Sequence, residues 1–169
     1  MSIHNQCVGA SDEWYTPPYV FHALGCAFDL DVASPGAAVT HWIPARRFIT
    51  ADSLKLDWRG FKWMNAPFGG RNGLVPWLEK FFAEGDGIAL TPDRTSAPWW
   101  QTYAAKADEV LFVSPKIKFI DANGQPGPSP ADGTTLMAAG PFAVEALRRA
   151  ASRGLGLSFP RPPNHSEAK

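Results

Sequence analysis

The sequence predicts an α/β domain in which a mostly parallel β-sheet is covered by helices on both faces. Short apolar runs of strand length alternate along the chain with segments whose apolar residues recur at helical spacing. Sixteen prolines and fifteen glycines separate these elements with frequent turns. Hydrophobic residues make up 45% of the chain and charged residues 19%, a balance that supplies a core and excludes an extensively disordered protein.

The length of 169 residues allows one domain. We assign residues 1–157 to this domain, with 1–12 loosely ordered, and residues 158–169 to a flexible C-terminal tail. No internal repeat divides the chain further.

The first half of the chain supplies one helix and three strands. Pro17 and Pro18 keep the residues before them extended, because proline disfavours helix in the preceding residue. A short helix then spans 20–24 and ends near Gly25. Residues 27–33 alternate apolar and acidic positions, which is typical of a strand. Two more extended stretches are predicted at 47–50 and 61–64.

The second half alternates helices with strands. Residues 74–84 carry apolar side chains at helical spacing, and Pro76 falls in the first turn, where proline is tolerated. The connection 121–133, rich in glycine and proline, is expected to be an exposed loop between two paired strands, 116–120 and 134–138. The other predicted strands are 87–91 and 109–113, and the other predicted helices are 98–106 and 142–153.

Charge and composition exclude several classes of protein. Sixteen lysines and arginines balance sixteen aspartates and glutamates, so the formal net charge is zero. Any DNA contact must therefore come from a local basic patch, because the protein as a whole is not positively charged. No apolar run is long enough for a membrane span, and the polar N-terminus is unlike a secretion signal. Cys7 and Cys26 lack the spacing of zinc ligands and are too few for a disulfide framework. We therefore expect a cytoplasmic protein without a metal.

Two polar residues stand where predicted strands end. Asp31 closes the strand at 27–33, and Asn65 follows the strand at 61–64. In parallel sheets, ligands bind outside the carboxyl ends of the strands. Asp31 and Asn65 are therefore candidates for a binding site, although acids and amides also end strands simply because they suit turns.

The segment Asn65-Ala66-Pro67-Phe68 has the most specific chemistry in the chain. Pro67 favours an extended backbone at Ala66, which directs the Ala66 carbonyl outward. Asn65 adds a side-chain amide oxygen, and Phe68 adds a flat apolar ring. The two glycines that follow permit close backbone approach. Two hydrogen-bond acceptors beside a ring form a receptor for a planar group that carries an amino substituent.

The chain resembles the phage-type DNA adenine methyltransferase (Dam) family over about residues 12–140. The resemblance lies in four ordered blocks, which are Trp14-Tyr15-Thr16-Pro17-Pro18, Phe28-Asp29-Leu30-Asp31-Val32-Ala33, Thr50-Ala51-Asp52-Ser53-Leu54 followed by Trp58, and Asn65-Ala66-Pro67-Phe68. Residues 88–92 and 112–119 match the later strands of the family more loosely. Ala66 departs from the family pattern, which usually has proline there, and lysine replaces an expected arginine in the segment 115–119. The resemblance implies a Rossmann-like, S-adenosylmethionine-dependent methyltransferase sheet. It also implies methylation of the 6-amino group of adenine in DNA, in the host cytoplasm if a phage encodes the protein.

The same resemblance implies roles for individual residues. The catalytic segment is Asn65, Ala66, Pro67 and Phe68, which would hold an adenine flipped out of the DNA stack. The residues assigned to S-adenosylmethionine are Trp14, Thr16, Pro17, Asp31, Ala33, Ser34 and Asp52. Among these, Asp52 would accept a hydrogen bond from the cofactor's adenine, and Asp31 would line the floor beneath its methionine and ribose parts. The basic residues assigned to DNA phosphates are Arg46, Arg47, Arg71, Arg94, Lys116 and Lys118.

Two alternative functions remain open from the sequence. An equivalent acceptor pocket would serve the amino group of cytosine or of a protein glutamine. The alanine at position 66, together with the absence of a Gly-x-Gly run after Asp31, is also compatible with a DNA-binding module that has reduced or lost catalysis.

Overall fold

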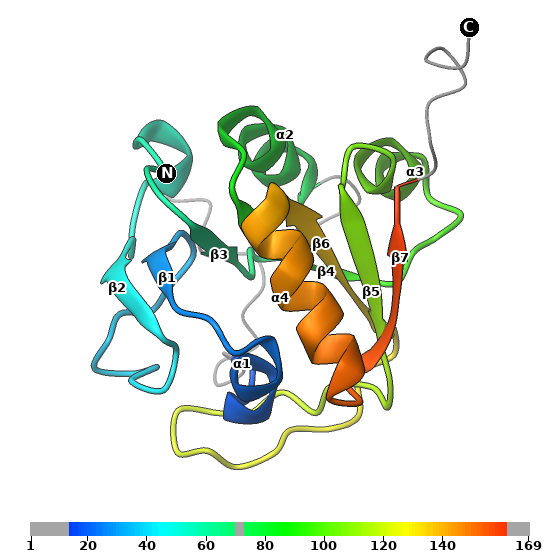
Figure 1. Cartoon of the computed structure of the whole chain (residues 1–169). Helices are drawn as coiled ribbons and strands as arrows, with labels where there is room; N and C mark the ends of the chain where they lie inside the picture. Colours follow the sequence, from blue (N-terminus) through cyan, green and yellow to red (C-terminus); the bar gives the residue numbers. More distant parts are fainter. Residues whose placement is uncertain (1–13, 70–72, 162–169) are drawn as a thin grey trace, which may run out of the picture.

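The computed structural model describes residues 14–69 and 73–161 and contains one seven-stranded sheet (Figure 1). The strands are β1 Phe28–Asp31, β2 Ala45–Phe48, β3 Lys62–Met64, β4 Gly87–Pro92, β5 Glu109–Val113, β6 Thr134–Ala139 and β7 Gly156–Pro160. Their order across the sheet is β2-β1-β3-β4-β6-β5-β7. Strands β1 to β5 run in one direction and β6 and β7 run in the other. The pairs within β2-β1-β3-β4 are parallel and the pairs within β4-β6-β5-β7 are antiparallel, so the sheet is mixed and the prediction of a mostly parallel sheet is correct for only half of it.

Helices cover both faces of the sheet, as the sequence predicts. The helices are α1 Pro18–Leu24, α2 Val75–Glu84, α3 Pro98–Ala104 and α4 Pro141–Ser152, with a short 3-10 helix, η2, at Ser53–Lys55. Alternate residues of the central strand β4 divide between two cores, because successive side chains of a strand point to opposite faces. Ile88 and Leu90 pack with α1 and α4, whereas Ala89 packs with α2 and α3. In Figure 1, α4 crosses the front of the sheet and α2 and α3 lie behind it.

Proline and glycine set the helix ends that the sequence analysis expects. Each of the four α-helices has a proline in its first two positions, where the missing N–H costs no helical hydrogen bond. Helix α1 ends at Gly25, which adopts a left-handed conformation with φ of 60° and donates its N–H to the Phe21 carbonyl. This end turns the chain directly into β1.

The predicted pairing of 116–120 with 134–138 is wrong. All six residues of β6 are buried, and β6 lies between β4 and β5, where both of its edges and both of its faces are covered. A two-stranded hairpin would have left this apolar strand at an edge of the sheet. Ile120 instead bridges to Tyr15 and to Pro126.

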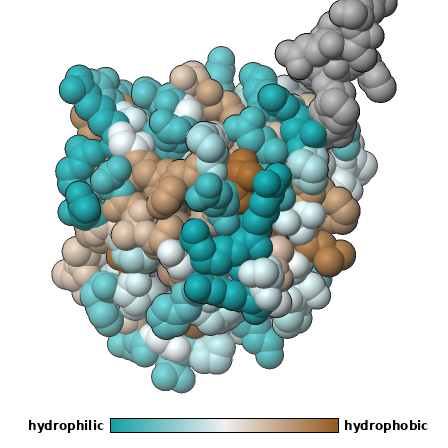
Figure 2. All heavy atoms as spheres, viewed as in Figure 1, coloured by the Kyte–Doolittle hydropathy of each residue, from teal (hydrophilic) through white to brown (hydrophobic). Residues whose placement is uncertain are grey.

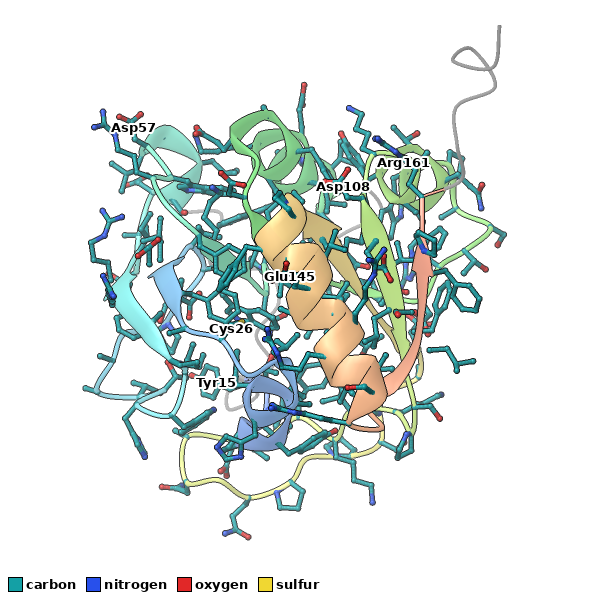
Figure 3. All side chains as sticks on the ribbon, in the orientation of Figure 1. Tyr15, Cys26, Asp57, Asp108, Glu145 and Arg161 are labelled. Carbon is teal, nitrogen blue, oxygen red and sulfur yellow. The ribbon has the colours of Figure 1, made fainter. Side chains whose placement is uncertain are left out.

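The predicted tail also begins too early, because residues 158–160 belong to β7. This strand pairs with β5 in antiparallel register and forms one edge of the sheet. At its end, the Arg161 N–H donates to the Asp108 carbonyl at 3.0 Å, and the two side chains form an ion pair at 3.8 Å (Figure 3). Its outward side chains, Leu157 and Phe159, are exposed, and hydrophobic atoms are visible over β7 in Figure 2. An exposed edge strand of this composition resembles a loop in sequence. Residues 1–12 and 162–169 lie outside the described part of the chain.

No helix within residues 14–69 and 73–161 is both long enough and apolar enough to cross a bilayer.

Candidate active site

The strand order reverses at β1, in the parallel half of the sheet. The chain places β2 on one side of β1 and then β3 on the other. In open α/β sheets, ligands bind at such a reversal, outside the carboxyl ends of the strands. Asp31 is the last residue of β1, and Asn65 directly follows β3. The structure therefore brings these two predicted site residues to adjacent strand ends.

The side chain of Asn65 is oriented by Thr16. Its Nδ2 donates a hydrogen bond of 3.2 Å to Thr16 Oγ1, and Thr16 is only 1% exposed. The Thr16 carbonyl in turn accepts a hydrogen bond of 2.9 Å from Trp42 Nε1. Within the described ranges, no donor occupies the Asn65 Oδ1 atom. The amide oxygen is thus kept available as an acceptor.

The rest of the segment changes from buried to exposed over three residues. Ala66 is 2% exposed, and Pro67 and Phe68 are exposed, Phe68 at 41%. Segment 65–68 is therefore packed into the protein through Ala66, whereas the Phe68 ring stays accessible to a flat partner. The arginine at position 71 lies outside the described residues, so its predicted DNA contact has no structural description.

Asp31 carries a carboxylate that is almost fully buried. It is 2% exposed, and Oδ1 accepts a hydrogen bond of 3.2 Å from the Ala33 N–H. Burial raises the pKa of the carboxyl group from 3.8 to about 6, against smaller lowering effects of the Ala33 N–H and the Ser34 hydroxyl. No lysine, arginine or histidine of the described chain forms an ion pair with it. Among the described residues, the ionised Asp31 carboxylate is therefore stabilised only by hydrogen bonds from neutral donors.

Asp52 lies at the start of η2, on a loop that is fastened to the end of β1. Ser53 Oγ donates a hydrogen bond to the Val32 carbonyl, and Trp58 Nε1 donates to the Ser53 carbonyl at 3.0 Å. Asp52 itself adopts a left-handed backbone with φ of 52°, and its exposed carboxylate pairs with Lys55 Nζ at 2.8 Å. The third predicted sequence block thus packs against the second.

The N-terminal block joins the site to the long connection between β5 and β6. Tyr15 and Ile120 exchange two backbone hydrogen bonds, of 2.8 and 3.0 Å. The Trp14 ring packs on Gly127, where an added Cβ would lie 2.5 Å from it. Pro17 is buried, and its carbonyl accepts a hydrogen bond from the Val20 N–H at the start of α1. Tyr15 lies beside α1 in Figure 3.

The predicted basic residues fall into two groups. The first group follows the carboxyl ends of β4 and β5 and consists of Arg94, Lys116 and Lys118. These strands run parallel to β3, so the group lies at the same end of the sheet as Asn65. Arg94 pairs with Asp132 at 3.2 Å, and Lys118 is exposed. Lys116 Nζ donates to the Ala131 carbonyl at 2.7 Å.

The second group lies toward the amino ends of β1 and β3. Arg46 pairs with Asp29 at 3.9 Å, and Arg47 Nη2 donates to the Arg59 carbonyl at 2.9 Å. These residues and Gly60 line a shallow open pocket. The structure does not bring Arg46 and Arg47 together with Asn65 and Asp31.

Sequence reasoning missed Trp42 and the Tyr15–Ile120 pairing. Trp42 fixes Thr16, yet it lies in the turn-rich segment before β2, where no spacing pattern marks it. Its only sequence signal is that it is one of seven tryptophans in a short chain. In the described ranges, no three histidine, cysteine, aspartate or glutamate side chains gather as a metal site requires.

Comparison with known proteins identifies the family. Residues 4–144 match the model of the DNA N-6-adenine-methyltransferase (Dam) family. A DNA N-6-adenine-methyltransferase of Haemophilus phage HP1 (strain HP1c1) is 25% identical over 130 residues, which cover 72% of this chain and 73% of that protein. No solved structure matches the chain. Since the family match covers most of the sequence, including all four motif blocks, the chain belongs to the DNA N-6-adenine-methyltransferase (Dam) family.

Proposed function

We propose that this protein transfers a methyl group from S-adenosylmethionine to the 6-amino group of an adenine that is flipped out of DNA. The family match supports DNA adenine methylation. The observation that carries the rest is the position of the Asn65 amide, held by Thr16 at the end of β3 and next to the buried carboxylate that ends β1. The reversal of strand order at β1, with parallel strands on both sides of it, supports a Rossmann-like reading of this half of the sheet.

The residues at the carboxyl end of β1 fit a cationic cofactor. Asp31 is buried and has neutral partners, so a positively charged ligand would stabilise its ionised form. S-adenosylmethionine carries an ammonium and a sulfonium group. Asp31, with Ala33 and Ser34, would hold its methionine and ribose parts, and Asp52 would accept from its adenine amino group. Trp14, Thr16 and Pro17 would enclose the methionine end.

The acceptor adenine must leave the DNA stack, because its amino nitrogen is otherwise committed to base pairing. Asn65 Oδ1 and the Ala66 carbonyl would each accept one hydrogen of the amino group. The exposed ring of Phe68, with Pro67 fixing the backbone before it, would stack on the purine. Ala66 is buried, and its packing supports the backbone that would present this carbonyl to the base.

These acceptors favour the transition state over the ground state. The bound cofactor supplies an electrophilic methyl group on sulfur. The amino nitrogen would gain positive charge as it takes the methyl group and the methyl–sulfur bond breaks, until it gives up one proton. Its hydrogen bonds to Asn65 Oδ1 and the Ala66 carbonyl would be strongest at that stage. The alignment of donor and acceptor by Asn65 and Phe68 supplies further acceleration.

Basic side chains at the sheet edge would hold the DNA backbone near the site. Arg94, Lys116 and Lys118 share the edge with Asn65, and Arg71 follows the motif in sequence. Arg46 and Arg47 would contact phosphates farther from the flipped base. Contacts of this kind position the duplex without reading its sequence.

The test compares Asn65→Ala with Asn65→Asp, which keeps a side-chain acceptor. Methyl transfer is measured as N6-methyladenine in duplex DNA, and binding of S-adenosylmethionine is measured separately by calorimetry. We expect Asn65→Ala to lower kcat by about 10² to 10³ while the cofactor still binds, and Asn65→Asp to retain measurable turnover. Wild-type turnover in the alanine variant, or no binding of S-adenosylmethionine by the wild type, would contradict the proposal.

A further inference from the structure

The connection between β5 and β6 contains a hairpin, residues 118–127, that the methylation chemistry does not use. Gly127 N–H donates to the Phe119 carbonyl at 2.8 Å, and Asp121 N–H donates to the Gln125 carbonyl at 2.9 Å. The Asp121 carboxylate accepts from the N–H groups of Asn123 and Gln125, at 2.8 and 2.9 Å. These hydrogen bonds hold the tip in one conformation, so hairpin 118–127 is an ordered turn.

Hairpin 118–127 is linked to Asn65 through the N-terminal segment 14–16. Ile120 pairs with Tyr15 through two backbone hydrogen bonds, and the next residue, Thr16, accepts the hydrogen bond of Asn65. Trp14, which precedes Tyr15 in the N-terminal segment, also contacts the hairpin, because its ring packs on Gly127. The connection leaves β5 and enters β6 at the end of the sheet where β3 ends and Asn65 follows. In Figure 1 this connection extends across one end of the molecule beside α1. Hairpin 118–127 therefore lies at the end of the sheet where DNA bound at Asn65 would lie.

The tip of the hairpin displays two unengaged amide side chains. Residues 122–126 are all exposed. Asn123 and Gln125 use their backbone N–H groups within the turn, and neither side chain is hydrogen-bonded to another described residue. A protein-bound amide that is free at both oxygen and nitrogen can form a bidentate pair with the N6 and N7 atoms of adenine in the major groove. The same groove is wide enough for a two-stranded β-ribbon.

The charge around the tip suits a DNA partner. Lys118 is exposed at the base of the hairpin, where its ammonium group is accessible to a DNA phosphate. The one acidic residue of the tip, Asp121, has its Oδ1 engaged by two backbone N–H groups. Lys116 fastens the connection by donating to the carbonyls of Pro130 and Ala131.

We propose that hairpin 118–127 enters the major groove beside the flipped adenine and that Asn123 and Gln125 read neighbouring base pairs, so that this element determines which DNA sequences are methylated. The proposal rests on the proposed function for its location. The reading element would then be carried by the same connection that pairs with Tyr15, next to Thr16 and its partner Asn65.

The experiment uses the full chain and a duplex library in which the bases around a central adenine are randomised. Wild type is compared with the double variant Asn123→Ala/Gln125→Ala, and both methylated and bound sequences are determined at a stated salt concentration. We expect the double variant to lose about 5- to 150-fold in preference at one or more flanking positions. Its affinity for S-adenosylmethionine and its methylation of disfavoured sequences stay as in the wild type.

Two control variants separate base reading from other effects. Gln101→Ala removes an exposed amide on α3 and should leave the preference unchanged. Lys118→Ala should weaken binding to all sequences alike and reduce the salt slope by about 1. Thermal unfolding of each variant confirms that the exposed substitutions leave the fold intact.

The outcomes distinguish this inference from the proposed function. If the wild type methylates with a sequence preference that the double variant retains, or methylates with no preference, the hairpin inference is wrong and the proposed function stands. If no DNA is methylated but the binding preference is lost in the double variant, the hairpin inference stands and the proposed function fails. Absence of both methylation and DNA binding overturns both.

Discussion

Asn65 and Thr16 lie 49 positions apart in the sequence, and their side chains are joined by a hydrogen bond of 3.2 Å. Thr16 is buried, and its own carbonyl is fixed by Trp42. The amide nitrogen of Asn65 is thereby occupied, and the amide oxygen is directed to the site. One bond thus connects the N-terminal block of the chain with the residue that would grip the acceptor amine.

Removal of the Thr16 hydroxyl should impair turnover more than substrate binding. Thr16→Val keeps the shape of the side chain but removes the acceptor for Asn65 Nδ2. A net contribution of about 0.5–1.5 kcal/mol for such a hydrogen bond corresponds to a loss of roughly 2- to 13-fold in kcat. Steady-state kinetics checks this, with Thr102→Val on the exposed face of α3 as the matched control. An unchanged kcat with a raised KM would show that Thr16 does not orient Asn65.

Replacement of Asp31 should stabilise the fold while weakening cofactor binding. The pKa of Asp31 is raised to about 6, so between about pH 4 and pH 6 the folded state binds more protons than the unfolded state. The free energy of unfolding therefore decreases as pH rises through this window and then levels off. Asp31→Asn abolishes this decrease and should gain up to about 3 kcal/mol at pH 7. Thermal unfolding against pH checks the sign, and a variant that is less stable than wild type at pH 7 would contradict it.

The same carboxyl group predicts a pH dependence of cofactor affinity. A cationic ligand beside Asp31 requires the ionised form, which is lost below the pKa of about 6. Calorimetry should show that the affinity for S-adenosylmethionine is level above pH 7 and falls about tenfold per pH unit below pH 6. In Asp31→Asn, the affinity should be low and independent of pH over this range. A pH-dependent profile in that variant would assign the dependence to another group.

Truncation of Phe68 should affect DNA and not the fold. The ring is 41% exposed, so Phe68→Ala should change the free energy of unfolding by no more than about 0.5 kcal/mol. Loss of stacking on the flipped base should lower kcat/KM by about 5- to 150-fold. Phe68→Tyr keeps the ring and should remain close to wild type. A large loss of stability in Phe68→Ala would place the ring in a packing role.

Proline at position 66 should be compatible with turnover. Within the described ranges, the Ala66 N–H donates no hydrogen bond, so proline removes none. Proline also restricts the unfolded chain, which should stabilise the protein by about 0.4–1 kcal/mol. We expect Ala66→Pro to methylate at the rate of wild type or faster. A slower variant would show that the buried space around Ala66 does not admit the proline ring.

Local patterning in the sequence determined most of the secondary structure and the family to which the chain belongs. Apolar spacing, with proline at helix starts and Gly25 at a helix end, correctly indicated the four helices and the strands β1 to β6. The order of the four motif blocks identified the family, because motif chemistry resides in short segments. These features depend on residues that are close in the chain, which is why they can be read without coordinates.

Only the tertiary structure decided how distant segments meet. It placed β6 between β4 and β5, added residues 158–160 to the sheet as β7, and paired Ile120 with Tyr15. It also selected Thr16 as the partner of Asn65 and left Asp31 buried with neutral neighbours. Burial and long-range hydrogen bonding depend on the packed sheet as a whole, and no spacing in the sequence encodes them residue by residue.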